Sequence, residues 1–393
     1  GGAAVALAPY ASVQRQGIPT EGPHGLGKTQ IVYEGGIGVL GGVNDDKYIL
    51  QDKAKYPKWK KDKPVQDDLA SKGGWIGMTD KYWLAALIPN QDQTIKAQYR
   101  VTQAGGTDIY DVNFVGPTQA LNPGATLTQK TRLFAGAKTV PLLRKYEYGA
   151  TTPPAIWEFW SSAKSEIPRF DDAVDWGMFR FFTRPIFNIL EIFYKLVGNF
   201  GLAIMLLTVV LKLVLYPMAD KSYESMAKMK KIAPEVEKLK AKHKDDPAKQ
   251  QQEMMGLYAK EKINPMMGCV PMLIQIPVFY SLYKVLTVTI EMRHAPFFGW
   301  IKDLSAPDPT NIFNLFGLIP VQMPEFLHLG IWPIIMGITM WVQMKLNPTP
   351  PDPTQQMIFA WMPLIFTFML ASFPAGLVIY WAWNNLLSVI QQA

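Results

Sequence analysis

The sequence predicts an N-terminal all-β sandwich domain followed by an α-helical polytopic membrane domain with five core transmembrane helices and a cytoplasmic helical hairpin. Two observations lead to this prediction. Up to about Arg169 the sequence is mixed and polar, with short alternating runs separated by turn residues. From Trp176 onward, long apolar runs alternate with charged or proline-rich segments, as is typical of membrane proteins. We therefore expect a β domain at residues 1–168, a membrane core at 199–393, and a connection at 169–198.

The β domain is predicted from runs that alternate apolar and polar residues or are rich in β-branched residues. Gly-Gly, Asn-Pro-Gly and Pro-Asn breaks separate these runs, which favours an antiparallel sandwich. His24 is the only histidine of the domain and no carboxylate pair stands out, so a scaffold or docking module is the simplest interpretation. A sugar-acting enzyme is an alternative that needs a paired acid and base. The expected strands lie at residues 30–33, 75–79, 82–88, 95–101, 109–115 and 126–134.

The connection at residues 169–198 is predicted to be a linker and an amphipathic helix at the membrane surface. Large apolar residues are mixed there with Arg180, Arg184 and Lys195, and Pro185 interrupts the run. This mixture suits a helix that lies in the membrane interface better than one that crosses the bilayer. An ordinary amphipathic packing helix is the competing interpretation.

Five apolar runs in the last part of the chain are long enough to be membrane spans. Tyr216-Pro217 is expected to end the first of them. Lys284 is near the end of the second, and we expect it to reach the outer interface close to Glu291. The predicted spans are residues 200–218, 265–290, 329–346, 355–373 and 374–390.

Residues 220–262 contain eleven lysines and eight acidic residues, and are predicted to form a hairpin of two helices. Asp246 and Pro247 supply an N-cap and a proline at the first helical position, so the helices should meet at residues 244–246. Glu224 and Lys228 are spaced as a helix-surface ion pair. The lysine excess predicts a cytoplasmic location for the hairpin.

Lys212 is the one cation inside the first predicted span, and Thr208 lies one helical turn before it. A charged side chain in a spanning helix normally faces a bundle interior or a water-filled cavity. Lys212 and Thr208 therefore predict a water-containing polar site between the helices at membrane depth. The alternative is a lysine that extends along the helix to the interface near Asp220.

The methionines of the third predicted span recur every fourth residue, at Met336, Met340 and Met344. Methionine is flexible and is used where a surface accepts many partners, so this face is a candidate contact for client segments. A stripe that faces lipid is the alternative.

Composition excludes several other classes of protein. The net charge of +7 is modest, and no basic patch with interleaved aromatic residues predicts nucleic-acid binding. Cys269 is the only cysteine, so the chain cannot form an intrachain disulfide. The opening sequence GGAAVALAPY lacks the features of a signal peptide. No catalytic residue, cofactor or metal site is expected.

Several stretches together resemble the YidC family of membrane-protein insertases, within the wider YidC/Oxa/Alb group. They include GWIGMTDKYWLAALIP, INPMMGCVPMLIQIPVF and FPAGLVIYWAWNNLLSVIQQ, and they occur in the order found in the family. In full, the matching stretches are residues 74–89, 134–147, 174–179, 216–240, 263–279, 297–309 and 373–392.

The resemblance implies a periplasmic β-supersandwich, an interfacial helix, and core spans around a hydrophilic groove that opens to cytoplasm and lipid. The family's usual first span is absent, and the β domain is expected to be incomplete at its N-terminus. Lys212 occupies the place of the family's groove arginine, and keeps the charge without the planar fork. Tyr380 stands where the family has a tyrosine pair, and Trp381 replaces the second tyrosine.

The implied function is that of a non-enzymatic insertase and chaperone. It would receive clients in the groove and release their transmembrane segments into the bacterial inner membrane, alone or with the Sec translocon. The β domain would be periplasmic and the C-terminus cytoplasmic. The expected partners are nascent membrane proteins, the Sec translocon, membrane lipids, and a ribosome or signal-recognition receptor at the hairpin. A transporter or channel is the alternative, but it predicts internal repeats, and we see none.

Three groups of residues are the candidate site. The client-binding groove is expected to comprise Lys212, Thr208, Gln275, Tyr380, Trp381 and Asn384. The hydrophobic slide for clients is expected to comprise Pro271, Phe279, Met336, Met340, Pro363 and Phe366. The recruitment surface of the hairpin is expected to comprise Lys228, Lys230, Lys231, Asp246 and Pro247.

Overall fold

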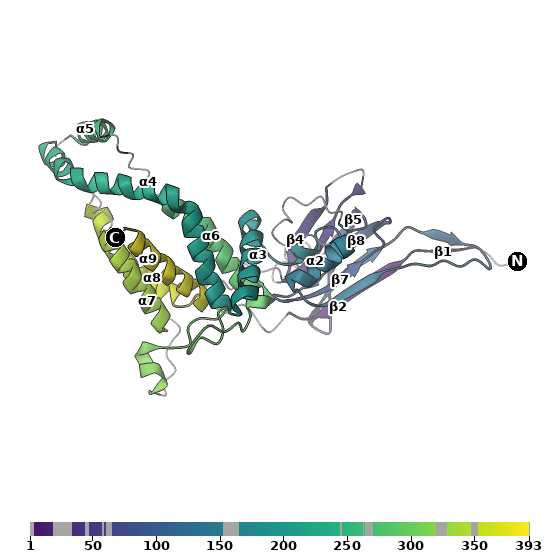
Figure 1. Ribbon diagram of the computed structural model, residues 1–393. Coiled ribbons are helices and arrows are strands. Elements are labelled where there is room, and N and C mark those ends of the chain that lie inside the picture. The colour runs from purple at the N-terminus through teal and green to yellow at the C-terminus, as the bar shows by residue number, and fades with distance from the viewer. Residues whose placement is uncertain are drawn as a thin grey trace. The chain divides into compact units, whose positions relative to one another are not determined.

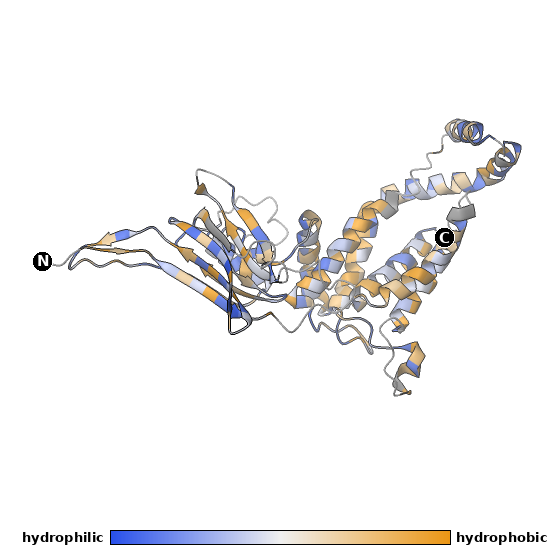
Figure 2. Ribbon diagram, turned by 180° about the vertical axis from the view of Figure 1, so that it is seen from behind, coloured by the Kyte–Doolittle hydropathy of each residue, from blue (hydrophilic) through white to orange (hydrophobic). Residues whose placement is uncertain are grey.

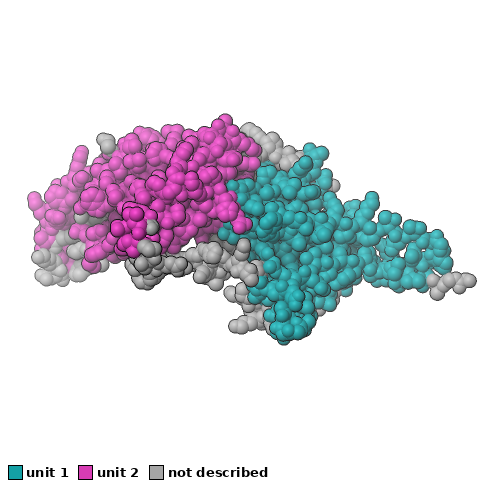
Figure 3. All heavy atoms as spheres, turned by 90° about the horizontal axis from the view of Figure 1, so that it is seen from below, with its two compact units in different colours: residues 1–177, 288–291 teal, residues 178–287, 292–393 magenta. Residues whose placement is uncertain are grey.

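A computed structural model divides the chain into two compact units, which Figure 3 colours separately. The β unit contains residues 1–177 and 288–291, and the helical unit contains residues 178–287 and 292–393. The structure describes residues 4–18, 34–43, 47–56, 59, 65–151, 165–243, 246–261, 263, 270–319, 328–346 and 353–392. The predicted strand at 30–33 and His24 lie outside these residues.

The β unit is built from antiparallel sheets (Figure 1). One sheet has the strand order β11-β7-β6-β3-β4, a second has the order β2-β9-β8-β5, and β1 pairs with β10. This agrees with the predicted N-terminal β-sandwich. The strands are β1 Val5–Leu7, β2 Tyr10–Gln16, β3 Gly35–Leu40, β4 Ile49–Lys55, β5 Val65–Lys72, β6 Trp75–Thr79, β7 Trp83–Ile88, β8 Thr94–Ala104, β9 Thr107–Val115, β10 Gln119–Leu121 and β11 Arg132–Ala137.

The core between the two larger sheets is rich in aromatic side chains. Tyr99 and Trp59 are buried and pack edge to face, with ring centroids 6.0 Å apart. Gly36 of β3 lies beneath both rings, because a Cβ there would come within 2.6 Å of Tyr99 and 2.8 Å of Trp59. The glycine-rich sequence of β3 therefore lets large rings approach the strand backbone.

Two sequence predictions for this unit need correction. The strand expected at residues 126–134 begins only at Arg132. The boundary expected after residue 168 lies at Gly177 instead. Phe170 packs against Trp75 at 5.3 Å between ring centroids, and the indole of Trp75 donates to the Pro168 carbonyl at 3.1 Å. These contacts hold the end of the predicted linker on the β unit, next to α2 (Val140–Tyr148).

The helical unit contains most of the chain's apolar runs, as the orange ribbon in Figure 2 shows. One helix, over residues 200–239, is long and apolar enough to cross a bilayer, and three shorter apolar helices follow it among the described residues. The helices are α3 Arg180–Val197, α4 Phe200–Lys242, α5 Pro247–Lys260, α6 Val270–Val288, α7 Ile331–Leu346, α8 Pro353–Leu370 and α9 Ala375–Gln392.

Helix α4 is longer than the sequence indicates. We expected Tyr216-Pro217 to end the first span, but the helix continues through Pro217 and Pro234 to Lys242. A proline removes one intrahelical hydrogen bond without necessarily ending the helix. The first half of α4 is apolar, and its second half is mixed in character, so a single helix joins the predicted span to the predicted hairpin.

Helix α7 packs closely against both α8 and α9 (Figure 1). Met336 and Met340 are buried in a cluster with Leu370 and Val378. Gly337 of α7 lies against α8, because a Cβ there would clash with the Thr367 hydroxyl oxygen. Both interpretations of the methionine stripe, as a client surface or as a lipid-facing surface, are therefore wrong for Met336 and Met340.

Lys284 was expected to extend to the outer interface, and this is also wrong. Its side chain is only 2% exposed on α6. Ser281, one turn earlier, is buried too, and its hydroxyl accepts a hydrogen bond from Thr183 of α3 at 3.3 Å. The face of α6 that carries Ser281 and Lys284 therefore packs inside the helical unit. The spacing of residues in the sequence does not show this.

Helix α3 combines features of both interpretations that the sequence left open. Ile186, Phe187 and Leu190 are buried, as in an ordinary packing helix. Phe181 and Leu196 are nevertheless exposed, which leaves apolar surface on the helix. The helix therefore packs within its unit through one face and exposes apolar side chains on another.

Candidate functional site

A small hollow of about 50 Å³ lies between α4, α6 and α9. Helix α9 is tied to α4 beside it, since the indole of Trp383 donates to the Met205 carbonyl at 3.2 Å. The lining combines aliphatic side chains with hydroxyl and amide groups and one cation. It comprises Thr208, Leu211, Lys212, Leu215, Met218, Ala219, Tyr223, Gln275, Val278, Tyr380 and Asn384.

Lys212 is partly buried on the wall of this hollow. Its Nζ donates a hydrogen bond to the Ser388 hydroxyl at 2.5 Å. Ser388 in turn donates to the Asn384 carbonyl at 2.8 Å. No carboxylate lies within ion-pair distance of Lys212 among the described residues. The cation therefore has a neutral partner within the chain and lines a hollow of mixed polar and apolar character.

The neutral polar groups of the hollow are held by bonds of their own. The Gln275 side-chain amide donates to the Tyr380 hydroxyl across α6 and α9. The Thr208 hydroxyl is buried and donates to the Ile204 carbonyl of its own helix at 2.7 Å. These bonds fix the walls, so the ammonium of Lys212 is the one charged group that lines the described hollow.

Five of the six predicted groove residues line this hollow, and Trp381 does not. The Trp381 ring packs instead between Phe279 and Phe366, at 4.8 and 5.3 Å between ring centroids. Trp381 follows Tyr380 directly and so points about 100° away around the helix. The placement of Trp381 in the groove is therefore corrected.

Ser388 is a partner of Lys212 that the sequence prediction missed. Tyr380, Asn384 and Ser388 are spaced four residues apart, so they lie on one face of α9. Extending the predicted face by one further turn would have found the partner of Lys212.

The predicted hydrophobic slide is only partly accessible. Met336, Met340 and Pro363 are buried, whereas Phe279 and Phe366 are half-buried beside Trp381. The side chain of Pro271 lies outside the described part of the chain. The exposed apolar surface near the hollow belongs to other residues, namely Leu213 on α4 and Leu273 and Ile276 on α6.

The residues of the predicted recruitment surface lie on α4 and α5. Lys228, Lys230 and Lys231 are exposed, and Lys228 pairs with Glu224 at 2.7 Å as predicted. Asp246 caps α5 by accepting a hydrogen bond from the Lys249 amide at 3.1 Å, which confirms the predicted N-cap. Pro247 is the first residue of α5.

The apolar faces of this helical pair cover each other. Ile232, Val236 and Ile263 are buried, and Met229, Met254, Leu257 and Tyr258 pack against them. Met255 is the exception, because its side chain is exposed. The lysines therefore remain on the outer surface of a self-contained pair of helices.

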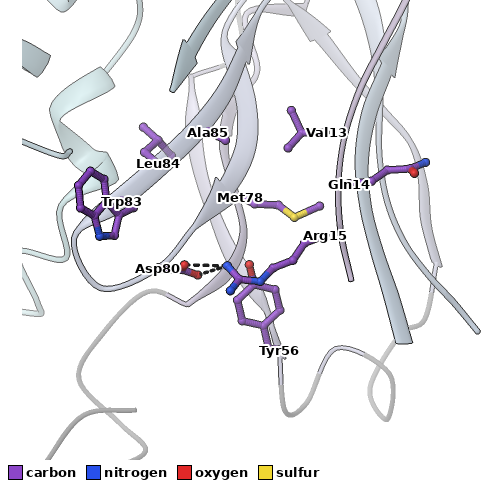
Figure 4. A pocket seen from close by; sticks show the side chains of 9 residues that line it. All are labelled: Val13, Gln14, Arg15, Tyr56, Met78, Asp80, Trp83, Leu84 and Ala85. Atoms are coloured by element: carbon purple, nitrogen blue, oxygen red, sulfur yellow. Dashed lines mark hydrogen bonds and ion pairs between the residues drawn. The ribbon is translucent and has the colours of Figure 1, made fainter. Parts of the chain in front are cut away.

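A second, larger cavity of about 250 Å³ lies in the β unit between β2, β6 and β7 (Figure 4). Arg15 closes one side of it and donates to both Asp80 carboxylate oxygens at 2.8 and 2.7 Å. The Arg15 guanidinium also lies 5.5 Å from the centre of the Tyr56 ring. Asp80 is the one carboxylate among the described lining residues and is already held by Arg15, so this cavity offers no acid–base pair for sugar chemistry.

A buried lysine lies beside this cavity. Lys138 donates to the Thr79 hydroxyl at 2.9 Å, and burial lowers its pKa to about 7, while the carboxylates of Asp175, Asp80 and Glu34 act in the opposite direction. Among the described residues, no group of three or more His, Cys, Asp or Glu side chains could hold a metal ion.

Comparison with known proteins divides the chain within α3. The family model for the 60Kd inner membrane protein matches residues 192–393, and the model for the YidC periplasmic domain matches residues 1–189. Membrane protein insertase YidC of Caulobacter vibrioides strain NA1000 is 74% identical over 393 residues, which cover 98% of this chain and 63% of that protein. The YidC insertase of Caulobacter sp. strain K31 is 70% identical and covers 100% of this chain and 64% of that protein.

A solved structure described as an active YidC insertase with the first transmembrane domain resolved is 20% identical to the chain. The alignment covers 90% of this chain and 82% of that structure, with a TM-score of 0.46. The chain spans just under two thirds of the length of the two Caulobacter relatives.

Proposed function

The chain belongs to the YidC family, and from this membership and the lysine-lined hollow we propose that it is the working core of a membrane protein insertase. In this proposal α4, α6, α7, α8 and α9 are the five core spans in a bacterial inner membrane. The β unit is periplasmic, and the helical pair formed by the second half of α4 with α5 is cytoplasmic, as is the C-terminus. No bond is made or broken, so the protein is not an enzyme.

The observation that carries the proposal is the Lys212 ammonium, which lines a partly polar hollow and has a neutral hydroxyl as its partner. A hydroxyl leaves the charge uncompensated, so an acidic or polar tail of a client protein can bind there. At about 4 Å and an effective dielectric constant of about 20, one such attraction is worth roughly 4 kcal/mol. This is enough to recruit a tail and weak enough to release it.

The client's apolar segment would then pass along exposed apolar side chains into lipid. Leu213, Leu273 and Ile276 supply this surface on α4 and α6, in place of the buried methionines. Transfer of the segment into the bilayer core supplies the main driving force. An inside-negative membrane potential adds about 2.3 kcal/mol per negative charge per 100 mV for an acidic tail that moves outward.

The lysine-rich helical pair is proposed to receive partners on the cytoplasmic side. Lys228, Lys230 and Lys231 form an exposed basic surface that suits a ribosome, a signal-recognition receptor or anionic lipid. Cooperation with the Sec translocon is a further part of the proposal. A transporter or channel is not favoured, because the relatives that match along the whole chain are insertases.

An insertion assay in proteoliposomes with a client that carries an acidic tail tests the proposal. Lys212→Met should reduce insertion at least ten-fold, which corresponds to about 1.4 kcal/mol, whereas Lys212→Arg should insert normally because it keeps the charge. A client with a neutral tail is the matched control and should insert equally with both variants. Equal insertion of the acidic client by Lys212→Arg and Lys212→Met would contradict the role of the cation.

A further inference from the structure

The segment between α6 and α7 contains an apolar tip, which we define as residues 312–319. It comprises the short helix η7 (Ile312–Gly317) and the two residues that follow. In Figure 1 the tip lies beyond the beginning of α7, at the opposite end of the helical unit from α5. Leu318 is 81% exposed and Phe316 is 58% exposed, and Phe313, Leu315 and Ile319 are exposed as well.

The sequence around the tip carries no charge. Residues 309–324 contain no Asp, Glu, Lys or Arg. A surface that binds a specific protein usually has a polar or charged rim. An uncharged run with exposed Phe, Leu and Ile side chains instead suits hydrocarbon.

Several backbone amides of the tip donate to groups within the tip or at its base. The Phe316 amide donates to the Asn311 carbonyl at 3.0 Å, and the Ile319 amide donates to the Asn314 carbonyl at 3.1 Å. The Asn311 side chain accepts from the Phe313 amide at 3.1 Å. Lipid offers no hydrogen-bond partner, so this internal satisfaction is what a segment entering the bilayer requires.

The tip adopts a backbone conformation that ordinary residues avoid. Leu315 and Phe316 have φ values of +50° and +60°. Side chains in this left-handed region are strained, and such strain is retained where the surrounding structure or a function requires it. Here two consecutive strained residues both carry exposed apolar side chains.

A rigid base holds the tip in position. Asp308 is buried and accepts from the Trp332 amide of α7 at 2.9 Å, from the Trp300 indole at 3.1 Å, and from the Thr310 hydroxyl at 2.7 Å. The Trp300 ring and nearby Phe298 are exposed. Aromatic rings of this kind are typical of the interface between membrane and water.

We propose that the apolar tip inserts into the outer leaflet of the bilayer and anchors the outer end of α7 there. The proposal rests on the proposed function, because it requires α6 and α7 to be membrane spans. The occupant is lipid, because the exposed side chains of the tip are apolar and the surrounding residues 309–324 carry no charge. An anchor at this position steadies the α6–α7 side of the helical unit while a client passes.

Spin-label depth measurements test the proposal in proteoliposomes of phosphatidylethanolamine and phosphatidylglycerol. In a Cys269→Ser background, nitroxide labels are attached to single cysteines introduced as Phe316→Cys and Leu318→Cys. Lys302→Cys, exposed in the same outer segment, is the matched aqueous control. Leu213→Cys, at a side chain 65% exposed on α4, is the matched lipid control.

The proposal predicts that labels at 316 and 318 collide more often with oxygen than with a water-soluble nickel chelate. The label at 213 should show the same preference for oxygen. The label at 302 should instead collide more often with the nickel chelate. Labels at 316 and 318 that prefer the nickel chelate would overturn it, because the tip would lie in water. Labels that neither reagent reaches would also overturn it, because protein would cover the tip. If the label at 213 also prefers the chelate, the proposed membrane placement of α4 fails, which is a separate result.

Discussion

Two lysines, one in each unit, have different surroundings. Lys138 in the β unit is 2% exposed, donates to Thr79, and lies near the carboxylates of Asp175, Asp80 and Glu34. Lys212 in the helical unit is partly buried, borders a hollow, and donates to the Ser388 hydroxyl. The first cation lies near three carboxylates of the chain, whereas the second has only a neutral partner among the described residues. Burial of a charge therefore does not by itself indicate a functional site, and the missing carboxylate partner beside a hollow is what makes Lys212 the candidate.

The largest effect that we expect from the difference between the two lysines is on the β unit, whose free energy of unfolding should depend on pH through Lys138. Burial lowers the folded pKa of Lys138 to about 7, below the unfolded value. The folded state then binds fewer protons than the unfolded state above about pH 7, so the free energy of unfolding rises with pH by about 1.4 kcal/mol per unit. Below that pH both states are protonated and the full cost of burial remains. Between pH 7 and 9 the gain should reach roughly 2 to 3 kcal/mol.

Pulse proteolysis in urea, scored on fragments from the β unit, measures this gain. Lys138→Met should abolish the pH dependence over this range. It should also leave client insertion unchanged, because Lys138 lies near carboxylates within the β unit. An unchanged slope in Lys138→Met, or a loss of insertion, would break the distinction between the two lysines.

A smaller effect concerns the partner of Lys212. Ser388→Ala removes the hydroxyl that accepts from the ammonium, and a hydrogen bond of this kind contributes about 1 kcal/mol or less when solvent can replace it. Insertion of an acidic client should therefore change by no more than about five-fold. Ser388→Thr keeps a hydroxyl and is the control. If Ser388→Ala reduced insertion of the acidic client as much as Lys212→Met does, insertion would depend on the shape of the hollow rather than on the charge of Lys212.

Much of the fold was predictable because local patterns determine it. The alternating runs at residues 75–79 and 109–115 became β6 and a large part of β9, and Asp246 became the N-cap of α5. Patterns that depend on packing were less informative. Met336 and Met340 were correctly placed on one helical face, but periodicity does not tell whether another helix covers that face. Pro217 lies within α4 because a proline weakens a helix without always ending it.

The candidate site was predicted largely because a charged residue in an apolar helix is expensive and therefore informative. Lys284 was instead expected to extend to the interface, and its surroundings were wrong because an exposed interface and a buried packed position both accept a long side chain with a polar end. Trp381 was placed in the groove by its family position, whereas its ring fills the space between Phe279 and Phe366. The apolar tip gave no recognisable sequence pattern, because its character depends on exposure and on backbone conformation.

The most direct test of the central claim is photocrosslinking from the hollow with Lys212 intact. A photoreactive residue at position 384, which lines the hollow from α9, should form an adduct with a nascent client that has an acidic tail. The account predicts that this adduct is lost when Lys212→Met is added, retained with Lys212→Arg, and weak for a client with a neutral tail. Adducts of equal yield with and without the cation would contradict the account.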